Sequence, residues 1–385
     1  MGYTVALRMW IADRILRNSH KSQRRPQTSN DLLGPLKSGQ QPTALSYFSS
    51  LKPHRFEKST HSPSPKLTIM ALSVAGKYAV ITGAGSGINL AFAKQLLERG
   101  CSVLIGDLAL RPEAEALLAQ YPKGRDGGGG GGGGSGQPHA LFQATNVASW
   151  PQLTRLWQRA LEAFPQVDIV CPGAGLFEPT RSAFWHPPRT ATNPDSPSTD
   201  AADADPGTYA VLDVNLTHPI RLSQLAVGHW TQARRPGCLV HVSSIAGHAV
   251  GLGSPLYFAS KHGLRAFVRS LGSLREHLGI RVGAVAPGAV MTPMWLEDPD
   301  KRAILDADAG AADIFIHPDE IAKGMMALCE DPAYGDGTIL EVTKGSTRVV
   351  PLYHAEPPSG VGSMVPGYQK AADELVTYVK GGVKV

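Results

Sequence analysis

The chain has 385 residues, of which 42% are hydrophobic and 18% are charged, and its formal net charge is +5. This composition is typical of a globular protein with a sizeable core, and it excludes a wholly disordered or collagen-like chain. Four scattered cysteines without a Cys-x-x-Cys pair exclude a disulfide scaffold, and no apolar run is long enough to indicate a membrane span.

The positive charge is concentrated in residues 1–70. This segment contains 11 Lys and Arg against 3 Asp and Glu, so the rest of the chain is net acidic. The basic balance therefore does not indicate a nucleic-acid partner. The segment is typical of a mitochondrial transit peptide in its Arg and Ser content, whereas Met70 is equally suited as a start just before the first strand. We expect a poorly structured extension and a cytoplasmic protein, with a mitochondrial location as the alternative.

A glycine-rich turn follows the first expected strand, 78–81, and precedes a helix that ends near Gly100. The turn reads Thr-Gly-Ala-Gly-Ser-Gly-Ile-Asn over residues 82–89. Glycines let the backbone bend sharply and let a pyrophosphate approach the positive end of a helix. The order of strand, turn and helix predicts a dinucleotide site that includes Gly83, Gly85, Ser86, Gly87 and Ile88.

The second expected strand, 101–105, ends in Gly106-Asp107. Asp107 lies 20 residues after Gly87, a spacing at which an acidic side chain accepts hydrogen bonds from an adenosine ribose. A carboxylate at this position repels a 2′-phosphate, and the glycine turn contains no Arg or Lys to attract one. We therefore expect NAD as the cofactor rather than NADP.

Strands and helices alternate through residue 345. Further strands are expected at 140–144, 167–171, 238–244, 281–286 and 338–342, with helices at 112–120 and 318–329. The alternation predicts a single α/β domain over 71–345, with a Rossmann-type, doubly wound parallel sheet of about seven strands and helices on both faces. Residues 124–137, which include eight consecutive glycines, and 181–207 are expected to be flexible inserts. Residues 346–385 are expected to form a C-terminal extension with a short amphipathic helix at 373–380.

Tyr257 and Lys261 place a phenol and an ammonium four residues apart in a segment with helical periodicity. Residues i and i+4 share a helix face, so the Lys261 charge can lie near the Tyr257 hydroxyl and lower its pKa. Such a pair provides a proton donor and acceptor near neutral pH. By itself the spacing also occurs in helices where the tyrosine packs at an interface and the lysine is solvated.

Together, the glycine turn and this pair resemble the short-chain dehydrogenase/reductase family over residues 72–345. The turn and the following Gly-Asp-Leu are similar to those of NAD-linked members of the hydroxyprostaglandin dehydrogenase type. The sequence departs from the family at two places: Asn89 replaces the last glycine of Thr-Gly-x-x-x-Gly-x-Gly, and Pro172-Gly173 replaces the two asparagines of Asn-Asn-Ala-Gly. At Asn89 we expect a local adjustment rather than a loss of cofactor binding.

The resemblance implies further contacts to the cofactor. Those residues would be Asn146 and Val147 beside the adenine, Gly173 after the fourth strand, Pro287 and Gly288 after the sixth, Thr292 at the nicotinamide carboxamide, and Tyr257 and Lys261.

It also implies hydride transfer between the nicotinamide and a carbon that bears oxygen. Tyr257 would exchange the hydroxyl proton, and Lys261 would lower its pKa and bind the ribose. Ser244, 13 residues before Tyr257, would hydrogen-bond the substrate oxygen, and Asn215 would complete a proton relay through water. The expected function is interconversion of a secondary alcohol, lipophilic by its apolar surroundings, and a ketone. Relatives imply a homodimer or homotetramer.

Two other functions stay open. The departures at Asn89 and Pro172 favour a catalytically weak nucleotide-binding protein that serves as a sensor or partner surface. Sugar epimerisation or dehydration usually accompanies a Gly-x-x-Gly-x-x-Gly turn, which this chain lacks. No His-x-x-x-His or Glu-x-x-His set is present, so no metal is expected.

Overall fold

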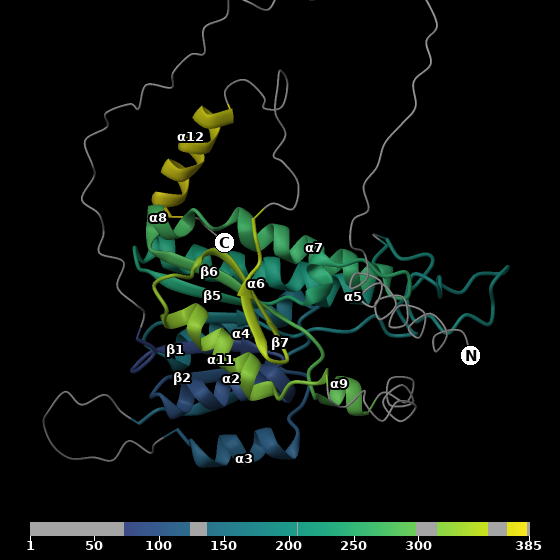
Figure 1. Ribbon diagram of the computed structural model, residues 1–385, viewed down its shortest axis with the longest axis horizontal. Helices are drawn as coiled ribbons and strands as arrows, with labels where there is room; N and C mark the ends of the chain where they lie inside the picture. The colour runs from purple at the N-terminus through teal and green to yellow at the C-terminus, as the bar shows by residue number, and fades with distance from the viewer. Residues whose placement is uncertain (1–72, 124–136, 206, 298–313, 353–367, 383–385) are drawn as a thin grey trace, which may run out of the picture. The chain divides into compact units, whose positions relative to one another are not determined.

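The computed structural model describes residues 73–123, 137–205, 207–297, 314–352 and 368–382 (Figure 1). The predicted N-terminal extension and most of the predicted glycine-rich insert lie outside these residues. An eight-stranded sheet with the order β3-β2-β1-β4-β5-β6-β7-β8 forms the centre. The strands are β1 (Tyr78–Thr82), β2 (Ser102–Asp107), β3 (Ala140–Ala144), β4 (Ile169–Pro172), β5 (Gly237–Val242), β6 (Ile280–Pro287), β7 (Asp336–Thr343) and β8 (Ser346–Val349).

Seven of these strands are parallel, as predicted, and β8 pairs antiparallel with β7 at the edge. The predicted Rossmann-type sheet is thus confirmed, with one strand more than expected. The sequence prediction missed β8 because its four residues are exposed, so they carry no apolar pattern. The hairpin turn at 344–345 instead places β8 against its neighbour.

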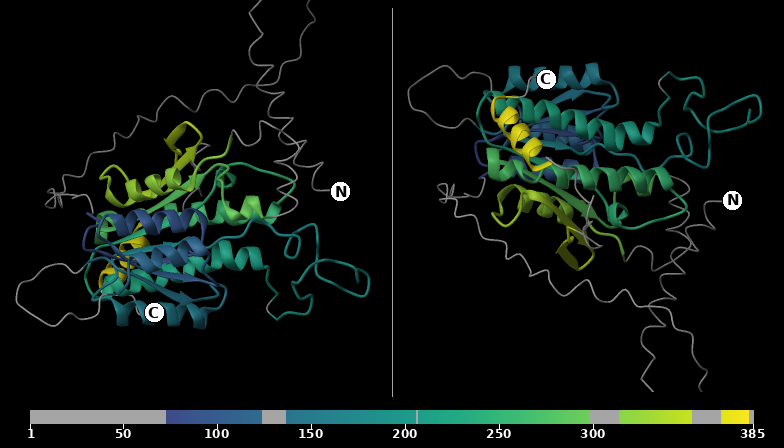
Figure 2. Two further views of the ribbon diagram at one scale, coloured as in Figure 1. Left: turned by 90° about the horizontal axis from the view of Figure 1, so that it is seen from below. Right: turned by 90° about the horizontal axis from the view of Figure 1, so that it is seen from above.

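Helices cover both faces of the sheet (Figures 1 and 2). They are α2 (Gly87–Glu98), α3 (Pro112–Gln120), α4 (Trp150–Ala163), α5 (Ala210–Leu212), the π-helical η2 (Asp213–Thr217), α6 (His218–Gln232), the 3₁₀ turn η3 (Ile245–His248), α7 (Pro255–Ser270), α8 (Leu274–Leu278), α9 (Pro293–Leu296), α11 (Pro318–Glu330) and α12 (Tyr368–Lys380). No helix among the described residues combines the length and apolar character needed to cross a bilayer.

The core has two layers because the strands are apolar on both sides. Ile81 and Ile105 face the layer that includes α2 and α11, whereas the adjacent Val80 and Leu104 face the layer that includes α4, α6 and α7. Side chains alternate across a strand, so a continuous apolar run supplies both layers, as is usual for parallel sheets buried on both faces. The sheet is therefore a rigid platform with its strand ends at one edge.

The segment 181–207 departs from this layered arrangement. It extends as a long loop beyond the layers (Figure 2), and its described part contains short isolated bridges but no regular strand or helix. Internal contacts order it locally: Arg189 donates to the carbonyl of Ser196 at 2.6 Å, and Ser196 donates to that of Pro187 at 2.5 Å.

Two buried histidines, His241 and His218, connect the sheet to α6 and to η2, which precedes α6. Nδ1 of His241, on β5, lies 3.3 Å from the Gly283 carbonyl, and its Nε2 lies 3.0 Å from the Ser223 hydroxyl. His218, the first residue of α6, similarly contacts the Val214 carbonyl and Thr82. A carbonyl only accepts, so Nδ1 of each ring carries the proton and Nε2 accepts. Burial lowers the pKa of both histidines to about 4.

These histidines make the stability of the protein fall in mild acid. The folded state keeps them neutral down to about pH 4, so between pH 6.5 and 4 the unfolded chain binds more protons than the folded one. We expect each histidine to remove up to about 3 kcal/mol of unfolding free energy as the pH falls across this range. Denaturant unfolding at several pH values measures this loss, and His241→Gln should reduce its slope. The same slope in both proteins would contradict the assignment.

Candidate active site

The residues predicted to bind a cofactor lie where parallel strands end. The glycine turn follows β1, Asp107 ends β2, Gly173 follows β4 and Gly288 follows β6. The strand order reverses between β1 and β4, and ligands bind open α/β sheets beyond the carboxyl ends of the strands at such a reversal. The fold thus brings together segments that are far apart in sequence.

Close backbone packing explains the glycines of the turn. Gly83 has a φ of +74°, and a Cβ there would lie 2.5 Å from Cα of Ala174. A Cβ on Gly85 would lie 2.3 Å from the carbonyl oxygen of Ala109. No larger residue fits either position, so the turn is held between the loops after β4 and β2. From the segment after β6, Cγ2 of Thr292 lies 3.3 Å from the Cβ position of Gly87.

The N-terminus of α2 is suited to an anion. Its N-cap, Ser86, makes no side-chain capping bond, and the first turn holds no acidic residue. The first N–H groups of a helix have no partner within the helix, and its dipole favours negative charge there. Ser86, Gly87 and Ile88 thus present an uncompensated positive end that fits a dinucleotide pyrophosphate.

Asp107 lies beside the glycine turn. Its Oδ2 accepts the Gly85 N–H at 2.7 Å, and its Oδ1 accepts the Leu108 N–H at 2.7 Å. Each carboxylate oxygen retains accepting capacity, and the side chain is only half-buried. The two backbone bonds fix the carboxylate at the position where sequence spacing predicted a ribose partner.

The other predicted cofactor residues lie on both sides of this centre. After β3, Val147 is buried, and exposed Asn146 uses its Oδ1 to accept the Ala148 N–H at 3.1 Å. After β6, Pro287 ends the strand, and Gly288 donates to the Val342 carbonyl at 2.9 Å. The structure thus places Asn146 toward the β3 side and Gly288 toward the β7 side of the same edge.

Tyr257, Lys261 and Ser244 meet at the start of α7. The Ser244 side chain interacts with the Tyr257 phenol and favours a lower pKa there, and Nζ of Lys261 lies 5.6 Å from the Tyr257 ring centroid. Lys261 also donates to the Val242 carbonyl at 3.0 Å. The fold therefore brings together the hydroxyls and ammonium that sequence reasoning selected.

Burial changes the pKa of both titrating groups. It raises the pKa of Tyr257, and the nearby Ser244 hydroxyl only partly offsets this. It also lowers the pKa of Lys261 to about 8. The sequence prediction was that Lys261 lowers the pKa of Tyr257, and the structure differs, because helical spacing gives the proximity of the two groups but not their desolvation.

Asn215 lies in η2 and holds the loop after β4. Its Oδ1 accepts the Leu176 N–H at 2.7 Å, and its Nδ2 donates to the Leu176 carbonyl at 2.7 Å. A Cβ on Gly175 would lie 3.4 Å from Oδ1 of Asn215 and 3.7 Å from Nζ of Lys261. Asn215 Oδ1 and Lys261 Nζ therefore both lie beside Gly175.

Sequence reasoning missed a buried network between Thr82 and His218. The Thr82 hydroxyl lies 3.0 Å from Nε2 of His218 and accepts the Gly173 N–H at 3.0 Å. Nδ1 of His218 lies 3.0 Å from the Val214 carbonyl. The network ties the glycine turn, the β4 loop and η2 together, and no motif in the sequence indicated it.

A second missed residue is Glu178, a buried carboxylate. Its Oε2 accepts the Tyr257 N–H at 2.9 Å, and its Oε1 accepts the Phe184 N–H at 2.8 Å. It thereby anchors the first turn of α7 to the long segment 181–207. An acidic residue accepting from the first turn of a helix also complements the helix dipole.

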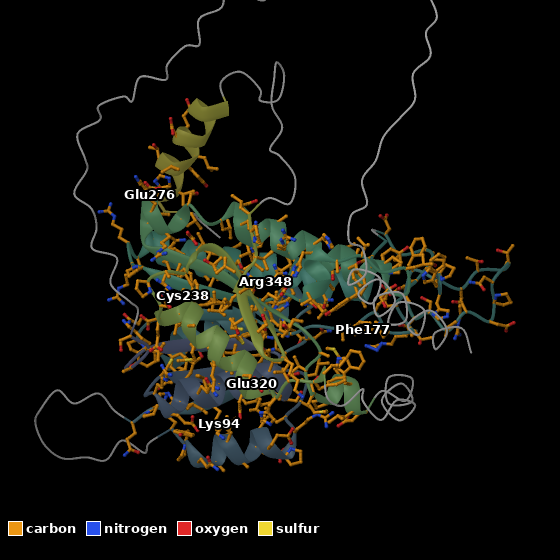
Figure 3. The ribbon with its side chains drawn as sticks, in the orientation of Figure 1. Lys94, Phe177, Cys238, Glu276, Glu320 and Arg348 are labelled. Atoms are coloured by element: carbon orange, nitrogen blue, oxygen red, sulfur yellow. The ribbon has the colours of Figure 1, made fainter. Side chains whose placement is uncertain are left out.

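A chain of aromatic rings extends from the Tyr257 ring. The Phe177 ring centroid lies 4.8 Å from that of Tyr257 and 6.2 Å from that of Trp295, which in turn contacts Phe315 at 5.2 Å. Phe177 lies on the side of the molecule from which 181–207 extends (Figure 3). The group Phe177, Trp295 and Phe315, here called the aromatic wall, gives this end of the site an apolar surface.

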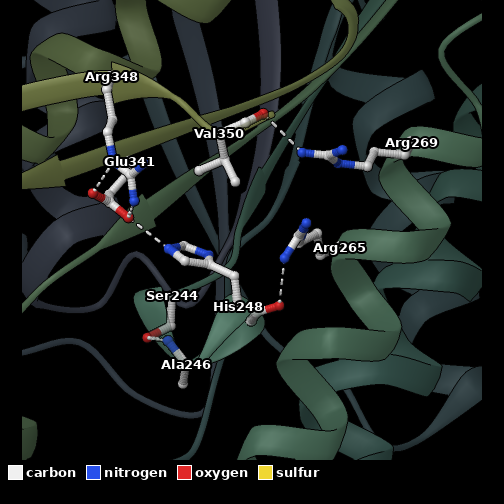
Figure 4. A network of polar contacts seen from close by, with 9 residues as sticks. Ser244, Ala246, His248, Arg265, Arg269, Glu341, Arg348 and Val350 are labelled. Atoms are coloured by element: carbon white, nitrogen blue, oxygen red, sulfur yellow. Dashed lines mark hydrogen bonds and ion pairs between the residues drawn. The ribbon is translucent and has the colours of Figure 1, made fainter. Parts of the chain in front are cut away.

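The Ser244 segment is also anchored from the β7–β8 hairpin (Figure 4). Buried Glu341 accepts from Arg348 Nε at 2.6 Å, and its Oε2 lies 2.5 Å from His248 Nε2. Arg348 first, and then His248, lower the pKa of Glu341 against the effect of its burial. On the other side, Arg265 of α7 donates to the Gly247 carbonyl at 3.1 Å. The edge strand β8 thus stabilises the turn that carries Ser244.

Comparison with known proteins gives the family of this chain. The sequence profile of short chain dehydrogenases matches residues 77–303. The chain belongs to the short-chain dehydrogenase family. The matched residues contain every predicted site residue from Gly83 to Thr292. The resemblance inferred from the motifs is therefore confirmed.

Individual relatives agree with this assignment. The cis-4-hydroxycyclohexanecarboxylate dehydrogenase of Sinomonas cyclohexanicum is 32% identical over 283 residues, which cover 73% of this chain and 100% of that protein. The 15-hydroxyprostaglandin dehydrogenase (NAD+) of Mus musculus is 26% identical over 288 residues, 71% of this chain and 91% of that protein. A crystal structure of levodione reductase has a TM-score of 0.53 at 22% identity, covering 70% of this chain and 97% of that one, and it shares the fold.

Membership defines the class of enzyme. The chain is an oxidoreductase that acts on CH–OH donors among small molecules, and this family uses NAD or NADP. Among the described residues, no group of three or more His, Cys, Asp or Glu side chains is placed to hold a metal ion.

The two hydrogen bonds between Asn215 and Leu176, here called the clamp, yield a structural prediction. Asn215→Ala removes both bonds to Leu176 and leaves a part-buried donor and acceptor unpaired, which costs about 1–3 kcal/mol. We expect hydrogen exchange of a peptide covering 173–178 to accelerate by about tenfold to a hundredfold, as measured by mass spectrometry. A peptide covering β2 serves as the internal control. Equal protection of the 173–178 peptide in both proteins would rule out the clamp.

Proposed function

We propose that this protein is an NAD-dependent dehydrogenase that interconverts an apolar secondary alcohol and its ketone, with Tyr257 as general acid and base. The observation that carries the proposal is that the Lys261 ammonium lies 5.6 Å from the Tyr257 ring centroid, with the Ser244 hydroxyl acting on the same phenol. These groups lie at the strand edge that also holds the glycine turn. When bound, the nicotinamide would supply or accept the hydride.

The polar side chains have distinct roles in this proposal. Ser244 donates to the substrate oxygen and stabilises its developing charge. The raised pKa of Tyr257 keeps the phenol protonated at neutral pH, so it can donate a proton when a ketone is reduced. In oxidation, the same oxygen takes the proton, and the adjacent Lys261 charge favours this. Asn215, which like Lys261 lies beside Gly175, supports a proton relay through water.

The geometry of the turn supports NAD over NADP. Asp107 places a negative charge beside the glycine turn, where it can accept from the ribose hydroxyls and would repel a 2′-phosphate. The bond from Gly85 keeps the carboxylate in place. The related mouse enzyme, whose name specifies NAD+, is consistent with this preference.

The aromatic wall supports an apolar substrate. Phe177 and Trp295 offer the substrate ring faces rather than charges at the Tyr257 end of the site. Two relatives are named for the hydroxylated compounds cis-4-hydroxycyclohexanecarboxylate and 15-hydroxyprostaglandin. We infer a secondary hydroxyl on a largely hydrocarbon frame, although neither of these compounds is assigned to this chain.

The assembly and location are also part of the proposal. We infer a homodimer or homotetramer in the cytoplasm. All four cysteines are buried free thiols, which suits a reducing compartment. Size-exclusion chromatography with light scattering tests the assembly, and a single monomer peak would contradict it.

Tyr257→Phe separates chemistry from binding. We expect turnover to fall by about a thousandfold, because general acid–base catalysis contributes about 10²–10⁴. The Kd for NADH should change little, because the ring and its packing on Phe177 are retained. NADH formation with a panel of secondary alcohols measures the first, and NADH fluorescence the second.

Tyr378→Phe, which alters an exposed tyrosine on α12, is the matched control and should behave as the native protein. Turnover by Tyr257→Phe at the native rate would remove Tyr257 from the mechanism. Native protein that binds NADH but turns over none of the panel would favour the sensor alternative.

Asp107→Asn tests the coenzyme preference. Asn keeps an oxygen for the Gly85 N–H but loses the charge that repels a 2′-phosphate. We expect the ratio of the Kd values for NADPH and NADH to fall by about tenfold or more, since one such interaction is worth about 1–3 kcal/mol. Glu113→Gln, an equal charge change on exposed α3, is the control. An unchanged ratio in Asp107→Asn would show that Asp107 does not select the coenzyme.

A further inference from the structure

The two departures from the family motifs lie against each other in the folded protein. Asn89 is the third residue of α2 and is 6% exposed, and Gly173 follows β4. A Cβ on Gly173 would lie 2.4 Å from Oδ1, 2.6 Å from Cγ and 2.6 Å from Nδ2 of Asn89. The Asn89 amide therefore fills the space that a side chain at position 173 would need.

This contact makes the two residues mutually dependent. Heavy atoms do not approach a Cβ within 3.0 Å, so any side chain at position 173 would require the Asn89 amide to leave its present position. Conversely, glycine at both positions would leave a buried void where the amide now lies. The family motifs show the reverse arrangement, with glycine on the helix and asparagine on the loop.

The Asn89 amide also connects the two segments. Its Nδ2 donates to the Gly83 carbonyl at 3.2 Å, and the Cys171 thiol lies 3.9 Å from its Oδ1. Gly83 is in turn packed against Ala174 of the β4 loop. The amide thus joins the first glycine of the turn to the end of β4, at the point where the strand order reverses.

We propose that Asn89 is a positioning residue that takes over, from the helix side, the role of the missing loop asparagine, and so holds the glycine turn and the β4 loop in the geometry that binds the dinucleotide. Asn89 acts through the backbone of the turn and does not touch the cofactor. This inference rests on the proposed dinucleotide site and deepens it. In this proposal Asn89 compensates for the glycine at position 173, so these two departures from the family motifs do not indicate a loss of nucleotide binding.

A double-mutant cycle tests this compensation. The four proteins are the native chain, Asn89→Gly, Gly173→Asn and the double variant, and the measurements are the Kd for NADH by fluorescence and the midpoint of thermal unfolding. We expect each single variant to bind NADH about tenfold or more weakly, since an unpaired buried group or a clash costs about 1–3 kcal/mol. The double variant should bind within about threefold of native, because coupled neighbours are not additive.

The cycle has clear contrary outcomes. Native-like binding by Asn89→Gly, or a double variant whose loss equals the sum of the single losses, would overturn the inference. If Gly173→Asn fails to fold, the yield of folded double variant replaces its Kd: recovery supports the compensation, and a misfolded double variant refutes it.

An isosteric variant separates positioning from general stability. Asn89→Leu keeps roughly the size and shape of the side chain but removes the donor to the Gly83 carbonyl without adding a charge. We expect weaker NADH binding with an unfolding midpoint within a few degrees of native. Gln95→Met is the matched control, because it removes a donor to the Asp319 carbonyl from the same helix, outside the turn, also without adding a charge. Unchanged NADH binding by Asn89→Leu would refute the connection through Gly83.

The cycle also distinguishes this inference from the proposed function. Native protein that binds neither NADH nor NADPH would remove the dinucleotide site itself. If the native protein binds NADH but the loss of binding in the double variant equals the sum of the single losses, only the role of Asn89 is refuted.

Discussion

The close approach of the glycine turn to the loop after β4 is the constraint on which the site depends. Gly83 and Ala174 pack backbone to backbone, and the Thr82 hydroxyl accepts the Gly173 N–H beside them. This contact sets the position of α2 and its N-terminus relative to β4. Through Leu176 and Asn215, it also sets the position of η2 and, beside Gly175, that of Lys261.

Buried polar groups hold this arrangement in place largely without charge. His218 and His241 are neutral and use one ring nitrogen as donor and the other as acceptor, so their burial leaves no unpaired ring nitrogen. Burial also raises the pKa of Tyr257, so the phenol stays protonated, and it lowers the pKa of Lys261 toward neutrality. Desolvation, more than the pairing of opposite charges, governs the electrostatics around the phenol.

The structure changes the meaning of the two motif departures. In the sequence, Asn89 and Gly173 are separate exceptions that weaken the match to the family. In the fold, the side chain of one occupies the space left by the other. The support of Ser244 by the His248, Glu341 and Arg348 network similarly comes from β8, an exposed edge strand without an apolar pattern.

The sequence by itself determined the parallel sheet, the glycine turn with Asp107, and the pairing of Tyr257 with Lys261. These features depend on local order and spacing: apolar runs buried on both faces, glycines where the backbone must bend, and side chains one helical turn apart. Only the tertiary structure decided the direction of the Tyr257 pKa, the roles of His218 and Glu178, the presence of β8 and the contact between Asn89 and Gly173. Each of these depends on burial or on contact between residues distant in the chain, and spacing along a sequence records neither.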